Sequence, residues 1–248
     1  MNVIGVIPAR YSSTRFEGKV LANISGKPMI QHVWERAKQA LILDDIIIAC
    51  DDERVADAAN SFGAKVVFTA KGHVSGTDRI IEVINPLEVK AVINIQADEP
   101  LIHPMMIEAV GRALLDDPKI SMTTLMKKIE DPAQVNDPHV VKVVVDRNNF
   151  ALYFSRAAIP HYPENSEIKE PVYYKHIGLY GYTKDFLFTY KNLPVSRLEK
   201  TERLEQLRVL EEGYRIKVIE TKYDTVGVDT PQDLEKVRAI VSASEGVK

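Results

Sequence analysis

Short apolar runs alternate with amphipathic stretches along the first half of the chain, and this alternation restricts the folds that the sequence can adopt. Four runs of strand length are predicted to be buried strands: Val3–Ile7, Ile46–Cys50, Val66–Phe68 and Ala91–Ile95. Strands that alternate with helix-length segments are typical of βαβ units and of a mainly parallel sheet. The pattern therefore predicts an α/β protein with a Rossmann-like sheet flanked by helices.

Three helices are predicted between these strands. The first opens at Pro28 and places apolar side chains at helical spacing: Ile30, Val33, Trp34, Ala37 and Leu41. The second covers about Glu53–Phe62 and stops near Gly63, and the third starts at residues 77–79.

The second half is less regular. Val140–Val145 and Ala151–Phe154 flank a turn signal at 146–149 and predict a hairpin, Ile177–Tyr182 is a further apolar segment, and 161–171 reads as an exposed loop. Two later helices are predicted, Thr201–Glu212 and Pro231–Val241. We expect a single domain, 1–248, with a nucleotide-binding part at about 1–130, a sugar-binding and dimerisation part at about 131–225, and a closing segment at 226–248.

Composition excludes several classes of protein. The 45% apolar and 27% charged fractions are those of an ordinary globular protein, and the longest apolar runs are too short to span a bilayer. The formal net charge of −3 argues against nucleic-acid or anionic-membrane binding. The start of the chain has no signal-peptide pattern, and Cys50 is the one cysteine of the sequence, so a cytoplasmic protein is expected.

The loop after the first predicted strand concentrates basic and hydroxyl side chains. Within ten residues it carries Arg10, Arg15 and Lys19 together with hydroxyls at 12–14. A triphosphate needs several cations and many donors at once, and this loop would leave the carboxyl end of a strand, where ligands bind in open α/β sheets. The alternative is a solvated basic loop, but the position after a buried strand favours phosphate binding.

Two aspartates are candidates for a magnesium site. Asp98 follows the strand Ala91–Ile95, and Asp229 precedes the last predicted helix. Carboxylates at strand ends suit Mg²⁺, which prefers oxygen ligands and bridges to phosphates. Each aspartate could instead be a helix N-cap, and Asp229 could serve both purposes.

The motifs, in order, resemble those of the 3-deoxy-manno-octulosonate (KDO) cytidylyltransferases, a branch of the sugar nucleotidyltransferases. The matching segments run from residue 4 to about 237: Ile-Pro-Ala-Arg-Tyr-Ser-Ser-Thr-Arg at 7–15, Ser-Gly-Thr-Asp-Arg at 75–79, Gln-Ala-Asp-Glu-Pro at 96–100, Phe-Ser-Arg-Ala-Ala-Ile-Pro at 154–160, Lys-His-Ile-Gly at 175–178, Leu-Glu-Gln-Leu-Arg at 204–208 and Val-Asp-Thr-Pro at 228–231. Glu17 and Val20 replace prolines of the family pattern, which should loosen the loop, and Ala97 replaces a glycine. A side chain at that position would be costly if the backbone there required a positive φ.

The resemblance implies that the protein joins CMP from CTP to KDO, with Mg²⁺ as cofactor and as a homodimer. It implies catalytic roles for Arg10, Lys19 and Asp98, and a metal site at Asp98 and Asp229. The implied nucleotide-binding residues are Pro8, Ala9, Arg10, Arg15, Lys19, Ser75, Gly76, Arg79, Gln96 and Asp98. The implied sugar-binding residues are Arg156, His176, Tyr180, Glu205 and Gln206, with Arg156 as a cation for the acid and Glu205-Gln206 on a helix. Taken singly, Arg156 reads as a surface cation and His176 as a core histidine.

Two alternatives remain open at this point. The acceptor could be another sugar acid, such as an 8-amino-KDO or a sialic acid, because the phosphate loop would look the same. The chain could also be a catalytically silent nucleotide-sugar-binding protein, although the presence of Arg10, Lys19, Asp98 and Asp229 disfavours this.

Overall fold

The structure is a computed structural model that describes residues 2–12, 16–73, 75–163, 167–168 and 170–245. One sheet contains, in spatial order, β11 (Lys217–Glu220), β7 (Met122–Lys128), β10 (Tyr174–Thr183), β6 (Ala91–Asn94), β1 (Val3–Ala9), β4 (Asp45–Cys50) and β5 (Lys65–Phe68). A hairpin of β8 (Lys142–Val145) and β9 (Ala151–Ser155) joins it through β10. The helices are α1 (Met29–Ala37), α2 (Glu53–Ser61), α3 (Gly76–Ile84), α4 (Pro104–Asp116), α6 (Lys184–Asn192), α7 (Arg197–Glu202), α8 (Leu207–Glu211) and α9 (Pro231–Glu245). The short elements are η1 (Lys19–Leu21), α5 (Ala133–Asn136), β2 (Asn23–Ile24) and β3 (Lys27–Pro28).

The sheet topology fixes where a ligand should bind. Strands β5, β4, β1 and β6 pair in parallel, and the chain builds outward from β1 first to one side and then to the other. The connection therefore reverses direction between β1 and β6, and the crevice beyond their carboxyl ends is the expected ligand site of such a sheet. The predicted α/β class and the four predicted strands are confirmed, with ends that differ by one or two residues.

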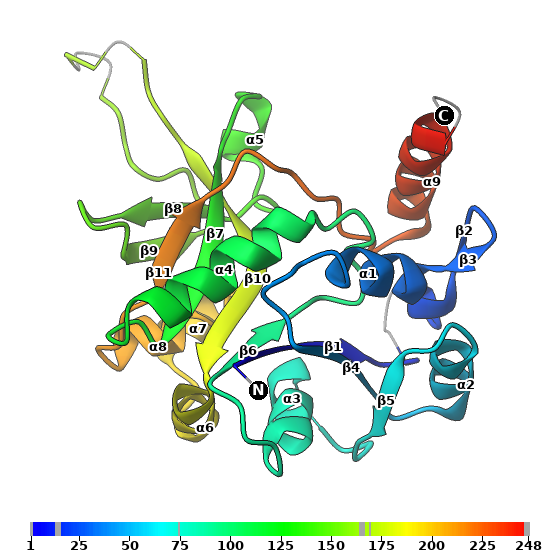
Figure 1. The fold of residues 1–248 in the computed structure, drawn as a ribbon. Helices are drawn as coiled ribbons and strands as arrows, with labels where there is room; N and C mark the ends of the chain where they lie inside the picture. The colour runs from blue at the N-terminus through cyan, green and yellow to red at the C-terminus, as the bar shows by residue number, and fades with distance from the viewer. Residues whose placement is uncertain (1, 13–15, 74, 164–166, 169, 246–248) are drawn as a thin grey trace.

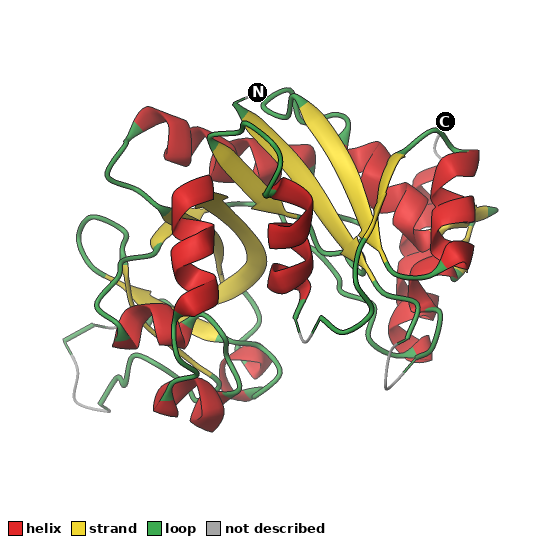
Figure 2. Cartoon of the chain, turned by 90° about the horizontal axis from the view of Figure 1, so that it is seen from below, coloured by secondary structure: helices red, strands yellow, loops and turns green. Residues whose placement is uncertain are grey.

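Helices cover both faces of the sheet (Figures 1 and 2). Alternate residues of β1 separate the two cores: Val3 and Ile7 pack with α1, α2 and α4, whereas Ile4 and Val6 pack with α3, α6 and α8. A third cluster holds α9 against β2 and Met29. Among the described residues, no helix has the length and apolar character needed to cross a bilayer.

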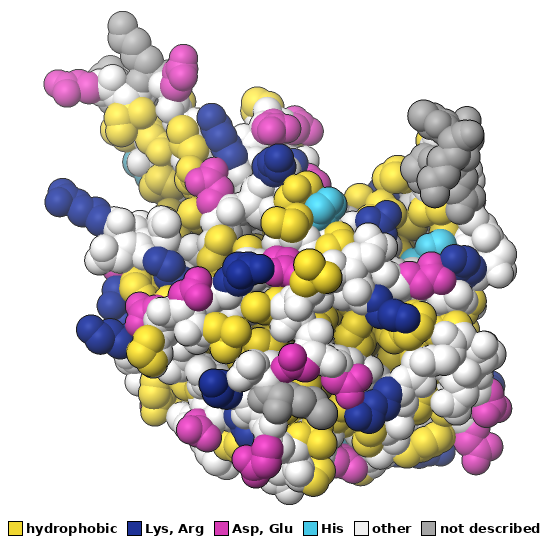
Figure 3. Space-filling view, in the orientation of Figure 1, with side chains coloured by type: hydrophobic (Ala, Val, Ile, Leu, Met, Phe, Trp, Pro, Cys, Tyr) yellow, Lys and Arg dark blue, Asp and Glu magenta, His cyan; other side chains and the backbone are white. Residues whose placement is uncertain are grey.

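Strand β10 runs antiparallel to β6 and β7 and carries the second half of the chain onto the sheet. Its Gly181 lies where the packing is tightest, since an added Cβ would come within 2.6 Å of side-chain atoms of Thr123 and Val110. The predicted hairpin over 140–154 is confirmed as β8–β9. On the face seen in Figure 3, acidic and basic side chains are interspersed rather than gathered by sign.

Two predictions about helices are wrong. The segment Thr201–Glu212 is not one helix, because α7 ends at Glu202 and Arg203 adopts a left-handed conformation (φ 54°) before α8 begins at Leu207. Leu41 is not on the buried face of the first helix, which ends at Ala37 and leaves Leu41 89% exposed. The elements α4, β7, α6 and β11 were not predicted from the sequence.

Candidate active site

A cavity of about 380 Å³ lies at the carboxyl ends of β1 and β6, at the point where the topology expects a ligand. Its lining residues are Pro8, Arg10, Ser12, Lys19, Val20, Gly76, Gln96, Ala97, Asp98 and Asp229. Six of the predicted nucleotide-binding residues are thus brought together, although they come from three separate segments of the chain: the loop after β1, the start of α3 and the end of β6. Arg15 falls outside the described residues.

Lys19 lies between the two predicted metal ligands. Its Nζ donates to Asp98 Oδ2 at 2.5 Å and to Asp229 Oδ1 at 3.1 Å, and it also donates to the carbonyl oxygen of Val228 at 3.1 Å. Burial alone would lower the pKa of Lys19, but the two carboxylates outweigh burial and raise the pKa above its ordinary value. Lys19 is therefore a permanent cation at the floor of the cavity.

His103 and Thr230 make side-chain contacts at the starts of α4 and α9. His103 caps α4, and its Nδ1 accepts from the amide of Met105. At α9 the amide of Asp233 donates to the Thr230 hydroxyl, and the Asp233 carboxylate accepts from the Thr230 amide. The carboxylates of Asp98 and Asp229 both line the cavity and meet at Lys19.

The paired carboxylates fit magnesium. Both reach a single ammonium nitrogen, so their oxygens converge on one small volume. Mg²⁺ commonly binds through one or two carboxylates and completes its octahedron with substrate phosphates and water. Across the residues that the structure describes, no cluster of three or more acidic, histidine or cysteine side chains forms a closed protein cage. The donor set suits a metal that arrives with a nucleotide.

The basic loop is held against α2 by a stack of side chains. Gly18 is left-handed (φ 67°) and donates its amide to the Tyr11 carbonyl at 2.8 Å, and the Arg54 guanidinium covers the Tyr11 ring at 3.4 Å from its centroid. Arg54 is in turn fixed by two 2.8 Å hydrogen bonds to the Asp52 carboxylate. This stack and the buried Val20 (3% exposed) restrain the loop that carries Arg10 and Lys19.

Ala97 is accommodated without backbone strain. The described non-glycine residues with positive φ are Ser25, Asn149 and Arg203, so position 97 does not need a glycine for its conformation. Its methyl group is 6% exposed and packs in the core.

A second cavity of about 330 Å³ adjoins the first, and Gly76 and Gln96 line both. Its other lining residues are Thr77, Asn94, Met122, Gly178, Tyr180, Tyr182, Tyr190, Arg203, Leu204, Glu205 and Gln206. Tyr180, Glu205 and Gln206, three of the predicted sugar-binding residues, are therefore placed together.

Phenol groups make up much of this second cavity. Burial raises the pKa of Tyr180 and Tyr182 well above the ordinary value, and so their hydroxyls stay protonated. The Tyr190 hydroxyl donates to Glu205 Oε2 at 3.3 Å. The cavity thus offers hydroxyl and amide groups beside a single carboxylate, a set that suits a polyhydroxylated ligand.

Glu205 and Gln206 lie in the turn between α7 and α8, not on a helix as predicted, because Arg203 breaks the helix before them. Arg203 itself was missed from the sequence. The sequence does show a basic residue directly before Leu204-Glu205-Gln206. A basic residue among the charged residues of a predicted helix does not, however, indicate a ligand site. A left-handed non-glycine residue costs roughly 1 kcal/mol, and such residues gather at functional sites.

Two predicted sugar-binding residues do not line either cavity. Arg156 donates from Nε to the Glu202 carbonyl at 2.7 Å and from Nη1 to the Pro138 carbonyl at 2.8 Å. His176 contacts Thr124 Oγ1 through Nε2 at 2.9 Å, and burial lowers its pKa to about 3. His176 is therefore a neutral, hydrogen-bonded histidine under the second cavity.

Three predicted nucleotide-binding residues do not line the first cavity, and their environments are structural. Ala9 is fully buried. The Ser75 hydroxyl caps α3 in a reciprocal box with Asp78. Arg79 is also fully buried and is paired with Asp51 at 2.7 Å.

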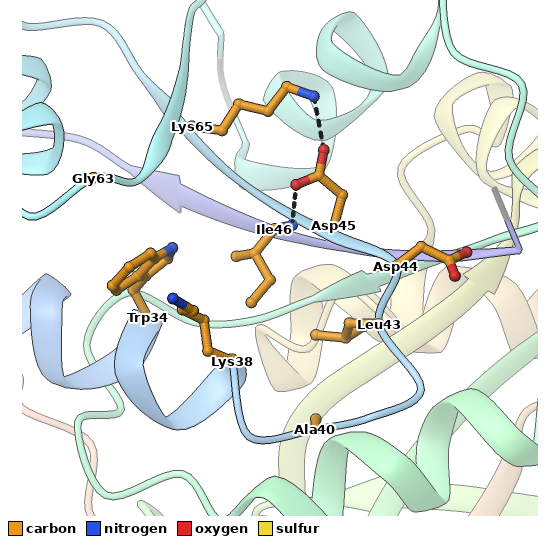
Figure 4. Close-up of a pocket in the computed structure, with 9 residues that line it drawn as sticks. All are labelled: Trp34, Lys38, Ala40, Leu43, Asp44, Asp45, Ile46, Gly63 and Lys65. Carbon is orange, nitrogen blue, oxygen red and sulfur yellow. Dashed lines mark hydrogen bonds and ion pairs between the residues drawn. The ribbon is translucent and has the colours of Figure 1, made fainter.

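A further cavity, of about 280 Å³, lies at the opposite, amino ends of β4 and β5 (Figure 4). It is lined by Trp34, Lys38, Ala40, Leu43, Asp44, Asp45, Ile46, Gly63 and Lys65. Its charged side chains have protein contacts: Lys65 pairs with Asp45 at 2.7 Å, Asp44 accepts from the amides of Asn2 and Val3, and Lys38 lies over the Trp34 ring. It contains none of the predicted site residues, and we assign it no role in the chemistry.

The chain is similar to known proteins in both sequence and fold. The sequence profile of the cytidylyltransferase family matches residues 4–218. The 3-deoxy-manno-octulosonate cytidylyltransferase of Solibacter usitatus is 54% identical over 242 residues, which cover 98% of this chain and 95% of that protein. The enzyme of the same description from Syntrophotalea carbinolica is 50% identical over 246 residues, covering 96% of this chain and 98% of that protein. A solved structure of CMP:2-keto-3-deoxy-manno-octonic acid synthetase in complex with CTP superposes with a TM-score of 0.93 at 45% identity, covering 98% of this chain and all of that one.

Proposed function

Because the chain belongs to the cytidylyltransferase family and shares about half of its residues with 3-deoxy-manno-octulosonate cytidylyltransferases, we propose that it transfers CMP from CTP to KDO. The products are CMP-KDO and pyrophosphate, and the pathway served is lipopolysaccharide biosynthesis. The observation that carries this assignment is the junction of the two cavities at Gly76 and Gln96, one lined by cations and carboxylates and the other by hydroxyl groups.

The two cavities divide the substrates between them. CTP phosphates are bound in the first cavity by Arg10, Ser12 and Lys19, which supply the positive charge and donors that a triphosphate needs. KDO is bound in the second, where Tyr180, Glu205 and Gln206 contact its hydroxyl groups. Gln96 faces both and is positioned to orient one substrate against the other.

The reaction is an in-line displacement at the α-phosphorus of CTP. The anomeric oxygen of KDO forms the new P–O bond, the bond to the bridging oxygen breaks, pyrophosphate leaves, and the anomeric proton passes to solvent. Such chemistry depends on positioning and on neutralising phosphate charge rather than on a protein nucleophile. Arg10 and Lys19 neutralise the phosphate oxygens, and the reacting groups meet beside Gly76 and Gln96, which line both cavities.

Asp98 and Asp229 would hold the magnesium ion, which when bound supplies further positive charge to the phosphates. We propose a homodimer formed in part by the β8–β9 hairpin, where Leu152 is 62% exposed on β9, the strand that pairs with β8. We also propose a cytoplasmic location, in keeping with the reduced and buried Cys50. We further propose that the single domain has three parts, with boundaries at about residues 130 and 225: a nucleotide-binding part, a sugar-binding and dimerisation part, and a closing segment.

A pyrophosphate-release assay that crosses four nucleoside triphosphates with KDO, 8-amino-KDO and a sialic acid tests the assignment. Release with CTP and KDO alone is expected. Preference for another acid would reassign the acceptor, and tight CTP binding without release would favour a silent binding protein. The Asp98→Asn variant should fold and bind KDO but lose turnover, and near-normal activity in it would contradict the proposed site.

A further inference from the structure

Asp229 reaches the first cavity on a strap, which we define as residues 221–230 between β11 and α9. Figure 1 shows the strap as the coil that leads from β11 to α9. All of its residues are described, and they form no helix or strand. The sheet ladders therefore do not hold this segment beyond its first residue, and side-chain and local backbone contacts have to fix the place of Asp229.

Asp224 connects the strap to two neighbouring strands of the sheet. Its Oδ2 accepts from Lys175 Nζ at 2.8 Å and from Lys127 Nζ at 3.1 Å. The two lysines are direct partners in the register of β10 and β7, and their side chains are only 16% and 15% exposed. Like charges directly opposite each other destabilise an antiparallel pair. Asp224 supplies the opposite charge between them.

We infer that Asp224 is a positioning residue for the metal site: by pairing with the two lysines, it holds the strap that carries Asp229. This inference rests on the proposed function, in which Asp98 and Asp229 hold the magnesium ion. Asp224 is not among the described residues that line either cavity, so its part is to place another side chain and not to touch a substrate.

The ion triad of Asp224, Lys127 and Lys175 keeps its charge at neutral pH. Burial alone would raise the pKa of Asp224, but the hydrogen bonds from Lys175 and Lys127 outweigh burial and lower the pKa. The carboxylate is 43% exposed, so salt in the solvent can weaken the triad. This sensitivity to salt separates the triad from the apolar and uncharged contacts of the strap.

Gly227 lies between the triad and Asp229. The nearest atom to a Cβ added at Gly227 would be a Glu99 carboxylate oxygen at 4.0 Å, so packing restrains the backbone little at this point. Beyond the glycine, Val228 is buried in the small cluster around α9, and its amide donates to the Asp98 carbonyl at 2.8 Å. This hydrogen bond closes the strap over the end of β6 and reports whether Asp229 is in place.

Two uncharged contacts support the strap beside the triad. The Tyr223 ring stacks on His103 with centroids 3.6 Å apart, and the Thr225 hydroxyl donates to the Glu99 carboxylate. Neither contact involves the two lysines, so both persist when Asp224 is neutralised. Loss of the charge should therefore loosen the strap without unfolding the protein, and the expected effects are moderate.

Hydrogen exchange in the metal-free protein, followed by NMR, tests the anchor without any turnover. In Asp224→Asn the Val228 amide should exchange about three- to tenfold faster than in wild type, the scale of one partly exposed charged contact, while amides of β4 keep their rates. High salt should raise the wild-type rate toward that of the variant, because it screens the triad. The matched control Glu220→Gln removes an equal charge from the exposed end of β11 and should leave the Val228 rate unchanged.

Magnesium titration of pyrophosphate release tests the effect on the site. Asp224→Asn should raise the Mg²⁺ concentration for half-maximal rate about three- to tenfold, in step with the exchange rate, because only the closed strap presents both carboxylates. Excess Mg²⁺ should restore kcat to within about twofold, since bound metal favours the closed strap, whereas general damage to the site would not be restored.

The double variant Lys127→Met/Lys175→Met should reproduce both changes, and adding Asp224→Asn to it should cause no further loss, because the three side chains act as one unit. An unchanged Val228 exchange rate or an unchanged Mg²⁺ requirement in Asp224→Asn would overturn the inference. So would a loss of kcat that excess Mg²⁺ does not restore, or additive losses in the triple variant. Wild-type enzyme that releases no pyrophosphate with any sugar acid would remove the proposed function, while hydrogen exchange would still decide whether Asp224 anchors the strap.

Discussion

Replacing His176 with glutamine should make the protein less sensitive to acid. The imidazole contacts Thr124, whose hydroxyl also donates to the carbonyls of Ile177 and Leu179, so the histidine Nε2 carries the proton in that contact. Burial lowers the pKa of His176 from 6.5 to about 3. The folded state therefore excludes a proton that the unfolded chain accepts below pH 6.5, and stability falls as the pH drops from there toward 3.

The size of the effect follows from this shift. At pH 5 the unfolded chain gains about 2 kcal/mol relative to pH 8 from protonating this one histidine, by the linkage relation. Glutamine keeps an amide donor for Thr124 but does not titrate, so the variant should lose about 2 kcal/mol less than wild type over this range. At pH 8 the histidine is neutral in both states, so the difference in the free energy of unfolding between wild type and variant measures only the cost of packing glutamine at this position.

Urea unfolding at pH 8, 6.5 and 5 measures this difference. At pH 8 the free energy of unfolding of the variant should be lower than that of wild type by the packing cost of the substitution. This difference should shrink as the pH falls, because only wild type loses stability through His176. Parallel curves across the whole range would show that His176 takes up its proton at the same pH in the folded and unfolded states, and the lowered pKa would be refuted.

Removal of divalent metal with EDTA should abolish pyrophosphate release, and Asp229→Asn should raise the Mg²⁺ concentration needed for half-maximal rate at least about tenfold. An unchanged requirement in steady-state kinetics would exclude Asp229 as a ligand. Arg54→Ala removes the guanidinium from the Tyr11 ring and should raise the KM for CTP about two- to fivefold with little change in the KM for KDO. Arg54→Lys should recover part of this loss. An unchanged KM for CTP in Arg54→Ala would contradict the conclusion that the Arg54–Tyr11 stack restrains the basic loop. Gly181→Ala should lower the free energy of unfolding by about 3 kcal/mol because the centre of the sheet is already full. Gly178 lies on the same strand with open space around it, so Gly178→Ala should lower this free energy far less. Equal losses for the two variants in urea unfolding would contradict the packing argument.

The fold of the first half could be predicted well because its determinants are local. A buried strand followed by a basic loop, and another followed by Asp98, are enough to bring these groups to one edge once the sheet is parallel. The pairing of Asp98 with Asp229 could not be derived in this way, because the two residues are far apart in the sequence and nothing in either segment specifies the other. The family resemblance supplied it, and the shared contact with Lys19 now gives it a geometric basis.

The second half was predicted less well for physical reasons. Leu204, Leu207 and Leu210 are spaced as on a helix, and no glycine or proline marks the break at Arg203. The break is imposed by tertiary contacts, chiefly those of Glu202 with Ser155 and Arg156 on the neighbouring hairpin. Propensity and spacing cannot report a turn that depends on partners 46 or 47 residues away.

The same contacts explain why the catalytic half and the selective half of the site are built so differently. The first cavity lies on strand ends whose positions are fixed by the parallel core, so its cations and carboxylates should change little when the second half of the chain varies. The second depends on a turn between two short helices, α7 and α8, held by side-chain bonds to the β8–β9 hairpin. Changes in that turn would alter the acceptor without disturbing Lys19 or Asp98. Selection among acids should therefore reside in residues 203–206, while the phosphate chemistry stays with the strands.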